Sequence, residues 1–211
     1  MIDKQNRFMI SINLKSNVLD YSFEIENIED RFDIHKSNEY IQYILNQESM
    51  DSITISDNEI KIDFTTKESV LENRDIINDI YEQMILKNPK CKISSGDFDI
   101  NLIFNTGEDL FLDKFKTYYN TNTDLKITFR GYTFYSTIYD YPVILAVDPY
   151  LINTSSYSAK ILFRIKTKSL KTLNTKLDKM IKHIYNNLEI VLTRYIKEKG
   201  DVPSEQSSMD K

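Results

Sequence analysis

Stretches in which apolar and polar residues alternate recur along this sequence, and they constrain its fold more than any other feature. Residues 8–14 carry Phe, Ile, Ile and Leu at every second position, and residues 19–25 repeat the pattern. A period of two predicts strands with one buried face. The same pattern predicts further strands, at 53–55, 60–64, 98–104, 125–130, 132–139, 143–147 and 158–167.

Other segments show the spacing and capping residues of helices. Ile41, Ile44 and Leu45 predict a helix over 37–47 with Ser37 as its N-cap. A capping box at Thr65 and Glu68 predicts a helix through Leu86 that ends before Asn88-Pro89. A second capping box at 106–109 predicts a helix through about Tyr119.

Residues 169–199 predict a long amphipathic helix. Its apolar residues fall on one face at about 100° per residue, and its lysines fall on the opposite face. Such a helix is longer than a small sheet requires, so we expect its far end to project or to pack on another module. Gly200 ends it, and residues 201–211 form a polar tail that we expect to be disordered.

These elements together predict an α+β protein made of two tandem modules. Each module has the order strand–helix–strands–helix with an antiparallel sheet, and the second ends in the long C-terminal helix. The predicted boundaries are 1–90 for the first module, 91–200 for the second and 201–211 for the tail. No linker rich in Pro or Gly separates the two modules, and Asn88-Pro89 marks the best boundary.

Composition and charge restrict the classes of function. The 211 residues have a net charge of −5, with one cysteine, two histidines and four glycines. An internal disulfide is therefore excluded, and we expect no zinc site, phosphate-binding glycine loop or other cofactor. Without an apolar run that spans a bilayer or a signal peptide at Met1, the sequence predicts a soluble, intracellular, cytoplasmic protein. Its low Ala and high Ile, Asn and Lys content is typical of an AT-rich genome, such as that of a virus or plasmid.

The charge is distributed unevenly. Residues 160–199 contain 11 Lys or Arg and three acidic residues, which leaves 16 basic and 29 acidic residues elsewhere. This asymmetry predicts a charged interface within the chain or with a partner.

Candidate catalytic residues are few. Asp51, Glu59 and Lys61 resemble a metal-dependent nuclease pattern, but Glu59 and Lys61 are also the ordinary outward positions of a strand. Cys91 lies between two lysines without a nearby histidine, and it is predicted to be an inert thiol. The histidines, His35 and His183, are predicted to be solvated. We therefore expect a protein that is not itself an enzyme.

Two surfaces are candidates for recognition. The segment 130–141 is rich in Tyr, Ser and Thr, a composition that suits binding surfaces and also an ordinary hairpin. Its candidate contact residues are Arg130, Tyr132, Tyr135, Tyr139 and Tyr141. The lysines of the last helix suit contacts with phosphates, although a charged helix face is more often only solvated.

Three stretches of the second half resemble the dimerisation module of RNA polymerase assembly subunits. Residues 99–109 (DINLIFNTGED) resemble the first strand and Gly-Glu-Asp helix start of that family. Residues 127–132 (ITFRGY) resemble the strand that ends in Phe-x-Gly-Tyr, and 160–167 (KILFRIKT) resemble the last strand before the dimer helix. The family includes the third and eleventh subunits of polymerase II, archaeal subunits D and L, and the amino-terminal domain of bacterial alpha. Leu110, Phe111 and Lys114 stand where the family usually has His, Thr and Asn.

The resemblance implies a non-catalytic platform on which the large catalytic subunits of a DNA-directed RNA polymerase assemble. It implies pairing of helices between the two halves of the chain or with a second small subunit, and only indirect contact with DNA. The implied interface residues are Leu110, Phe111, Phe115, Tyr118, Leu173, Leu177, Met180, Ile184, Leu188 and Val191. The alternatives are a viral or phage accessory protein that inhibits a host factor, a ligand carrier whose last helix grips a curved sheet, and a nucleic-acid-binding protein.

Overall fold

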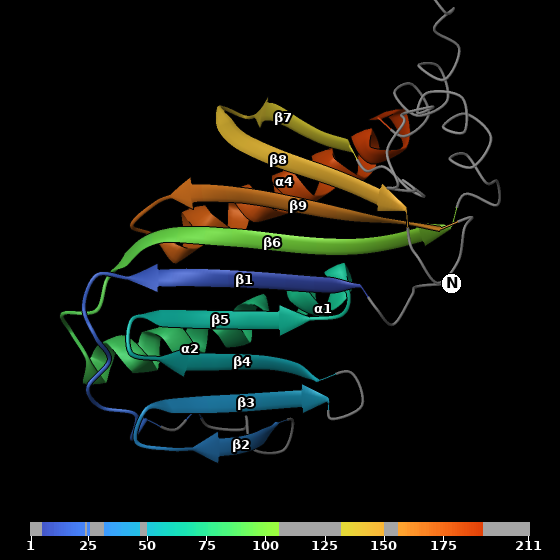
Figure 1. The fold of residues 1–211 in the computed structure, drawn as a ribbon. Helices are drawn as coiled ribbons and strands as arrows, with labels where there is room; N and C mark the ends of the chain where they lie inside the picture. The colour runs from blue at the N-terminus through green and yellow to red at the C-terminus, as the bar shows by residue number, and fades with distance from the viewer. Residues whose placement is uncertain are drawn as a thin grey trace, which may run out of the picture.

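One continuous antiparallel sheet dominates the computed structural model of this chain (Figure 1). The structure describes residues 6–23, 25, 32–46, 50–105, 132–149 and 156–191. Within these residues nine strands are arranged in the order β2-β3-β4-β5-β1-β6-β9-β8-β7. The predicted fold of two strand–helix–strands–helix modules with separate sheets is therefore wrong, because β1 of the first half pairs directly with β6 of the second.

The first half of the chain supplies one side of the sheet. Its strands pair as antiparallel neighbours, and Ile10 of β1 lies opposite Ile62 of β5 and opposite Phe98 of β6. Two helices follow, joined at Asn73. The elements are β1 (Arg7–Leu14), β2 (Asp33–Lys36), β3 (Tyr40–Asn46), β4 (Asp51–Ser56), β5 (Glu59–Phe64), α1 (Lys67–Glu72) and α2 (Arg74–Lys87).

The described part of the second half supplies the other side of the sheet and the helix α4. The 13-residue strand β6 pairs with β9 from Ser95↔Lys166 to Asn105↔Ser156, the longest ladder in the described residues. A tight hairpin of β7 and β8 completes this side. The elements are β6 (Ile93–Asn105), β7 (Tyr132–Ile138), β8 (Tyr141–Pro149), β9 (Ser156–Lys166) and α4 (Leu170–Val191).

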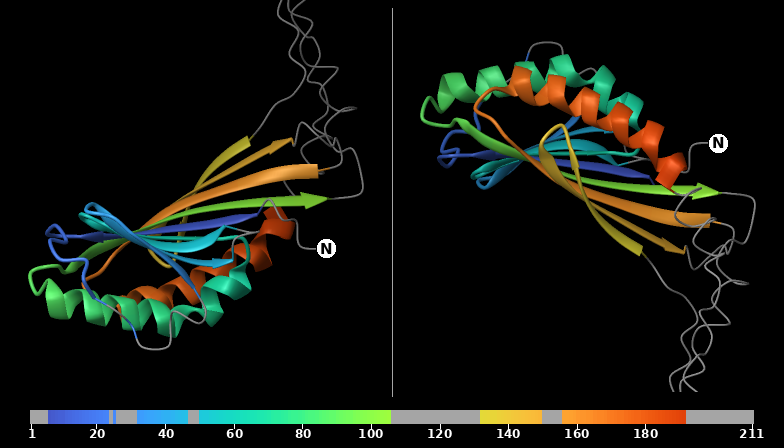
Figure 2. Two further views of the ribbon diagram at one scale, coloured as in Figure 1. Left: turned by 90° about the horizontal axis from the view of Figure 1, so that it is seen from below. Right: turned by 90° about the horizontal axis from the view of Figure 1, so that it is seen from above.

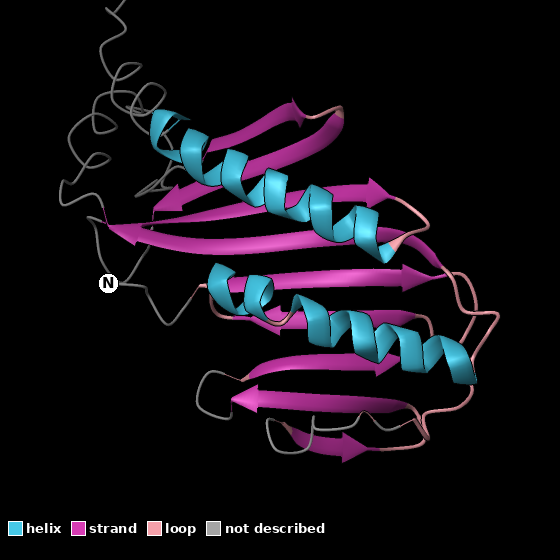
Figure 3. Ribbon diagram, turned by 180° about the vertical axis from the view of Figure 1, so that it is seen from behind, coloured by secondary structure: helices cyan, strands magenta, loops and turns pink. Residues whose placement is uncertain are grey.

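The three described helices, α1, α2 and α4, cover the same face of the sheet (Figures 2 and 3). Alternate residues of the strands point towards them: Phe8, Ile10, Ile12 and Leu14 of β1 are buried, and the residues between them are half-buried. The opposite face carries no helix of the described chain (Figure 1). We call it the open face. None of the described helices is long and apolar enough to cross a membrane.

The last helix packs on the sheet as far as Ile184, and the far end that was expected to project lies outside the described side chains. Leu170, Leu173, Leu177, Met180, Ile181 and Ile184 form its buried face and belong to the same core as the strands. Because these side chains already cover apolar surface of the sheet, the helix has a partner within its own chain. The predicted tail and residues 192–199 lie outside the described residues.

Two predicted elements are wrong. The segment predicted as a helix over 37–47 forms part of a β2–β3 hairpin in its described residues, 37–46. Ile41 and Tyr43 are buried with strand alternation, and the Ser37 hydroxyl accepts hydrogen bonds from the Glu39 and Tyr40 amides in the turn. Residues 19–23 form no strand. There the Asn88 side chain takes the place of a strand ladder, because it accepts from the Leu19 and Asp20 amides and donates to the Asp20 carbonyl.

The helix after β5 begins one residue later than predicted. Thr66 is its N-cap, and the Thr66 hydroxyl accepts a hydrogen bond from the Ser69 amide. The predicted cap, Thr65, is held instead by the buried carboxylate of Asp51, which accepts from the Thr65 amide at 2.8 Å and from its hydroxyl at 3.0 Å. Asn88 ends α2 as predicted.

Candidate functional site

A row of apolar side chains crosses the open face of the sheet. The strand registers place Tyr135 of β7 opposite Ile144 of β8, Ile144 opposite Leu162 of β9, and Leu162 opposite Asp99 of β6. Asp99 in turn lies opposite Met9 of β1. Residues directly opposite in an antiparallel sheet share a face. Since Phe8, Ile10, Ile161 and Phe163 point into the core, this row points away from the helices.

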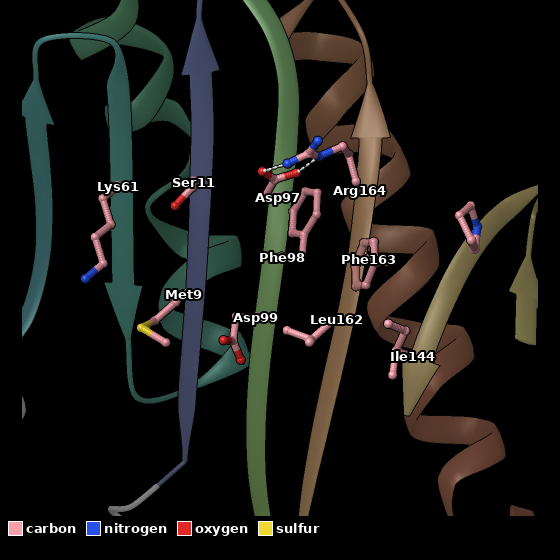
Figure 4. Close-up of a pocket in the computed structure, with 11 residues that line it drawn as sticks. Met9, Ser11, Lys61, Asp97, Phe98, Asp99, Ile144, Leu162, Phe163 and Arg164 are labelled. Carbon is pink, nitrogen blue, oxygen red and sulfur yellow. Dashed lines mark hydrogen bonds and ion pairs between the residues drawn. The ribbon is translucent and has the colours of Figure 1, made fainter. Parts of the chain in front are cut away.

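Four residues of the row, Ile144, Leu162, Asp99 and Met9, line a shallow groove of about 600 Å³ (Figure 4). Met9, Leu162 and Ile144 supply its apolar floor, Pro142 lies beside them, and Lys61 stands at the end over β5. Tyr135 is 80% exposed and Ile144 36% exposed. Large apolar side chains on the solvent side of a sheet are the feature of this face that needs a functional explanation.

Ion pairs lie in the groove and near it on the same face. The Asp97 carboxylate of β6 accepts two hydrogen bonds from the Arg164 guanidinium of β9, in a bidentate arrangement (Figure 4). Lys160 of β9 forms an ion pair with Asp99 of β6 at 3.1 Å. Arg7 of β1 forms another with Asp63 of β5 at 3.4 Å. The hydrogen bonds and negative charge of Asp97 raise the pKa of Arg164 further above its ordinary value. Asp97, Asp99 and Arg164 thus give the groove charges of both signs, with Asp99 between Leu162 and Met9.

The tyrosine-rich segment forms the β7–β8 hairpin at one edge of the described sheet. Its turn residues Tyr139 and Asp140 have φ of 47° and 67°, the left-handed pair that suits a two-residue hairpin turn. The Tyr139 ring meets the His183 ring of α4 edge-on, with 5.4 Å between centroids. The Lys176 ammonium donates to the Tyr141 hydroxyl and lies 4.7 Å from the centre of that ring. These contacts hold the tip of the β7–β8 hairpin against α4.

The predicted recognition residues are thus divided. Tyr135 faces solvent on the open face, whereas Tyr139 and Tyr141 contact α4, although Tyr139 remains 57% exposed. Tyr132 lies in β7 with its side chain outside the described part of the structure, and Arg130 lies outside the described residues altogether.

The predicted helix interface falls mainly in the core. Leu173, Leu177, Met180 and Ile184 are 1–6% exposed and pack in the same core cluster as the sheet. Binding a partner through them would require α4 to leave the sheet. Leu188 and Val191 lie in the last turns of α4, but their side chains are not described. Leu110, Phe111, Phe115 and Tyr118 lie outside the described residues.

The nuclease-like residues are not brought together. Asp51 begins β4 and Glu59 begins β5, and the register Ser52↔Asp63 and Ser56↔Glu59 puts them at opposite ends of this hairpin. Asp51 is buried and holds Thr65, whereas Lys61 is exposed on the open face. Among the described residues no group of three or more His, Cys, Asp or Glu side chains is arranged to hold a metal ion.

The single cysteine is a packing residue. Cys91 is 1% exposed, and its Sγ donates to the carbonyls of Ser16 and Asn17 at 3.2 Å. Burial raises the pKa of the Cys91 thiol, which opposes formation of the reactive thiolate. His183 is half-buried against Tyr139, and His35 is exposed in β2. In these contacts neither histidine lies beside the Cys91 thiol, so they do not pair a nucleophile with a base.

Sequence reasoning missed Met9, Ile144 and Leu162. A signal was present, because Val143–Val147 and Ile161–Phe163 are continuous apolar runs rather than alternating ones. Such a run indicates a strand with apolar side chains on both faces. The ion pair of Asp97 and Arg164 had no comparable signal, since it depends on the register of β6 and β9.

No protein-family model, curated protein or solved structure matches this chain. The fold and the site therefore define it only as an α+β protein, with a single nine-stranded antiparallel sheet in its described part and an apolar groove on the sheet's open face.

Proposed function

We propose that this protein is a non-catalytic platform that binds another protein on the open face of its sheet. The observation that carries the proposal is the row of Tyr135, Ile144 and Leu162, three large side chains aligned across three strands on the open face. The partner surface that fits this row has an apolar centre with charged residues of both signs around it.

The composition of the site favours a protein over a small molecule. Protein interfaces have an apolar centre enriched in Tyr, Met and Arg and a polar rim. The open face has these components: Ile144 and Leu162 are adjacent apolar residues, Arg164 pairs with Asp97 beside them, and the Asp99 carboxylate, paired with Lys160, lies between Leu162 and Met9. A ligand carrier instead needs an enclosed cavity between helix and sheet. Leu173 packs directly on Gly96, which leaves no space between α4 and the sheet at that point.

Assembly of a DNA-directed RNA polymerase is the narrower form of this proposal, and it rests on the sequence resemblance alone. Residues 99–105 and 160–166 of the resembling stretches lie on the adjacent strands β6 and β9, and both strands contribute to the groove. In this form the large catalytic subunits are the partner and the protein acts inside the cell. Inhibition of a host factor is the competing form, and the same surface would serve it.

Retention of a partner by a tagged protein expressed in its native cell tests the proposal. The test variant replaces the three side chains of this row by residues of high strand propensity, Tyr135→Thr, Ile144→Thr and Leu162→Thr. The control is Leu19→Thr, which removes an apolar side chain that is 86% exposed in the loop after β1. Thermal unfolding of both purified proteins checks that the sheet remains intact.

The proposal predicts that a stoichiometric partner remains with the wild type and the control and is lost from the triple variant. Large polymerase subunits in that fraction would support the narrower form, and a single unrelated protein would support inhibition of a host factor. A partner retained by the folded triple variant would contradict the proposal, because it would have to bind elsewhere.

A further inference from the structure

The helix-covered side of the molecule carries two stripes of opposite charge. On α4 and just before it, Lys168, Lys171, Lys179 and Lys182 are exposed; we call them the basic stripe. On α2, Asp75, Asp79 and Glu82 are exposed; we call them the acidic stripe. At about 100° per residue, each stripe lies opposite the buried face of its own helix. Both stripes therefore form the outermost surface of the helix layer.

The two helices lie side by side on the sheet (Figure 3). Asn174 of α4 donates to Asn78 of α2 at 3.2 Å, so the two helices meet at this point. A polar groove of about 670 Å³ runs between them, with Asp75 and Glu82 on one wall and Lys168 and Lys171 on the other. Within the described part of the chain, no ion pair joins the basic stripe to the acidic stripe. Lys182 instead forms an ion pair with Asp178 of its own helix.

We infer that this surface binds a second copy of the chain, and that the two copies are related by a two-fold axis. An axis parallel to the helices and between them places α2 of each copy over α4 of the other. The basic stripe then meets the acidic stripe twice, as the self-complementary interface of a two-fold dimer requires. Leu86, 71% exposed and in line with the acidic stripe, adds an apolar contact.

The acidic stripe is the reason to choose a second copy over nucleic acid. A nucleic acid lying along the basic stripe would bring its phosphates close to the carboxylates of α2. It would also meet a molecule with 29 acidic and 16 basic residues outside 160–199. In the dimer, the basic stripe of each copy faces the acidic stripe of the other, so stripes of like charge do not face each other.

Sedimentation of the purified full chain at low and high salt tests the inference. Because salt screens exposed charges, we expect a dimer at about 0.05 M salt and a rise of about tenfold or more in the dissociation constant at about 0.5 M. One variant carries Lys171→Glu, Lys179→Glu and Lys182→Glu, and a second carries Asp75→Lys, Asp79→Lys and Glu82→Lys. A control, Lys15→Glu with Lys90→Glu and Lys92→Glu, makes the same charge change at exposed residues outside the helices.

Each stripe variant alone should be monomeric, because both contacts of its dimer become repulsive. An equimolar mixture of the two should form a heterodimer, since each acidic helix again faces a basic one. The control should dimerise like the wild type. Circular dichroism confirms folding of each variant.

A wild type that is monomeric at low salt would overturn the inference, as would stripe variants that still dimerise or a mixture that does not associate. A monomer that binds duplex DNA, with loss of that binding in the Lys→Glu variant alone, would assign the basic stripe to nucleic acid instead.

Discussion

Leu173 of α4 lies directly over Gly96 of β6, so close that a Cβ placed on Gly96 would stand 2.5 Å from Leu173 Cδ1 and 3.2 Å from Phe98 Cε2. Leu173 is 1% exposed and cannot move aside into solvent. Because Gly96 has no Cβ, α4 can approach this closely to the centre of the sheet.

We predict that Gly96→Ala destabilises the protein by about 1–3 kcal/mol, because it overpacks this contact. In the background of Leu173→Val, which shortens the opposing side chain, the same change should cost less. Chemical denaturation of the four proteins in this double-mutant cycle gives the coupling between the residues. Equal costs in both backgrounds would show that Leu173 is not the obstacle.

Leu177 tests whether the apolar face of α4 belongs to the core of a single chain. It is 3% exposed, so Leu177→Ala should lower the free energy of unfolding by about 2–5 kcal/mol in the purified protein without any partner. Lys179→Ala, an exposed change on the same helix, should alter it by less than about 0.5 kcal/mol. If both variants unfold like the wild type, α4 is not seated on the sheet.

Asp51 should matter for stability because of the hydrogen bonds it accepts. Asp51→Ala leaves the buried Thr65 amide and hydroxyl without their acceptor, at a cost of about 1–3 kcal/mol. Asp51→Asn keeps an oxygen acceptor and should recover part of that loss. Equilibrium unfolding of the two variants makes the comparison, and an Asn variant no more stable than the Ala variant would contradict this role.

The loop at Tyr21 predicts a loss of stability at alkaline pH. Burial, with the charge and hydrogen bond of Asp57, raises the pKa of Tyr21 from 10.0 to about 12. A raised pKa means that the folded state holds the proton more tightly than the unfolded state does. The stabilisation is thus complete below pH 10 and is lost as pH rises towards about 12. The control, Tyr21→Phe, should show a smaller decrease in the free energy of unfolding over this range.

The sequence predicted individual strands better than it predicted their arrangement. The alternation in residues 8–14, 60–64 and 158–165 marked β1, β5 and β9 because each has one buried face. The segment 37–47 was wrongly predicted to be a helix because Ile41, Ile44 and Leu45 fit helical spacing. The burial of Ile41 and Tyr43 instead follows from the pairing of β3 with β4. The single sheet depends on the pairing of β1 with β6, about 90 residues apart, which no local pattern reports.

The candidate site follows the same division. Tyr135 was found from local composition, while the row it shares with Ile144 and Leu162 exists only through the registers of three strands. The helix residues predicted to bind a partner carried a correct signal of burial, but their partner within the described residues is the sheet of their own chain.

Site-specific photo-crosslinking in the native cell tests the central claim most directly. A crosslinking amino acid at position 135 samples the open face, and one at position 86 samples the helix-covered side; both native side chains are at least 71% exposed. We predict a covalent adduct with a different protein from position 135 and none with that protein from position 86. Capture of the partner from position 86 alone would contradict the account, because it would place the binding surface on the helices.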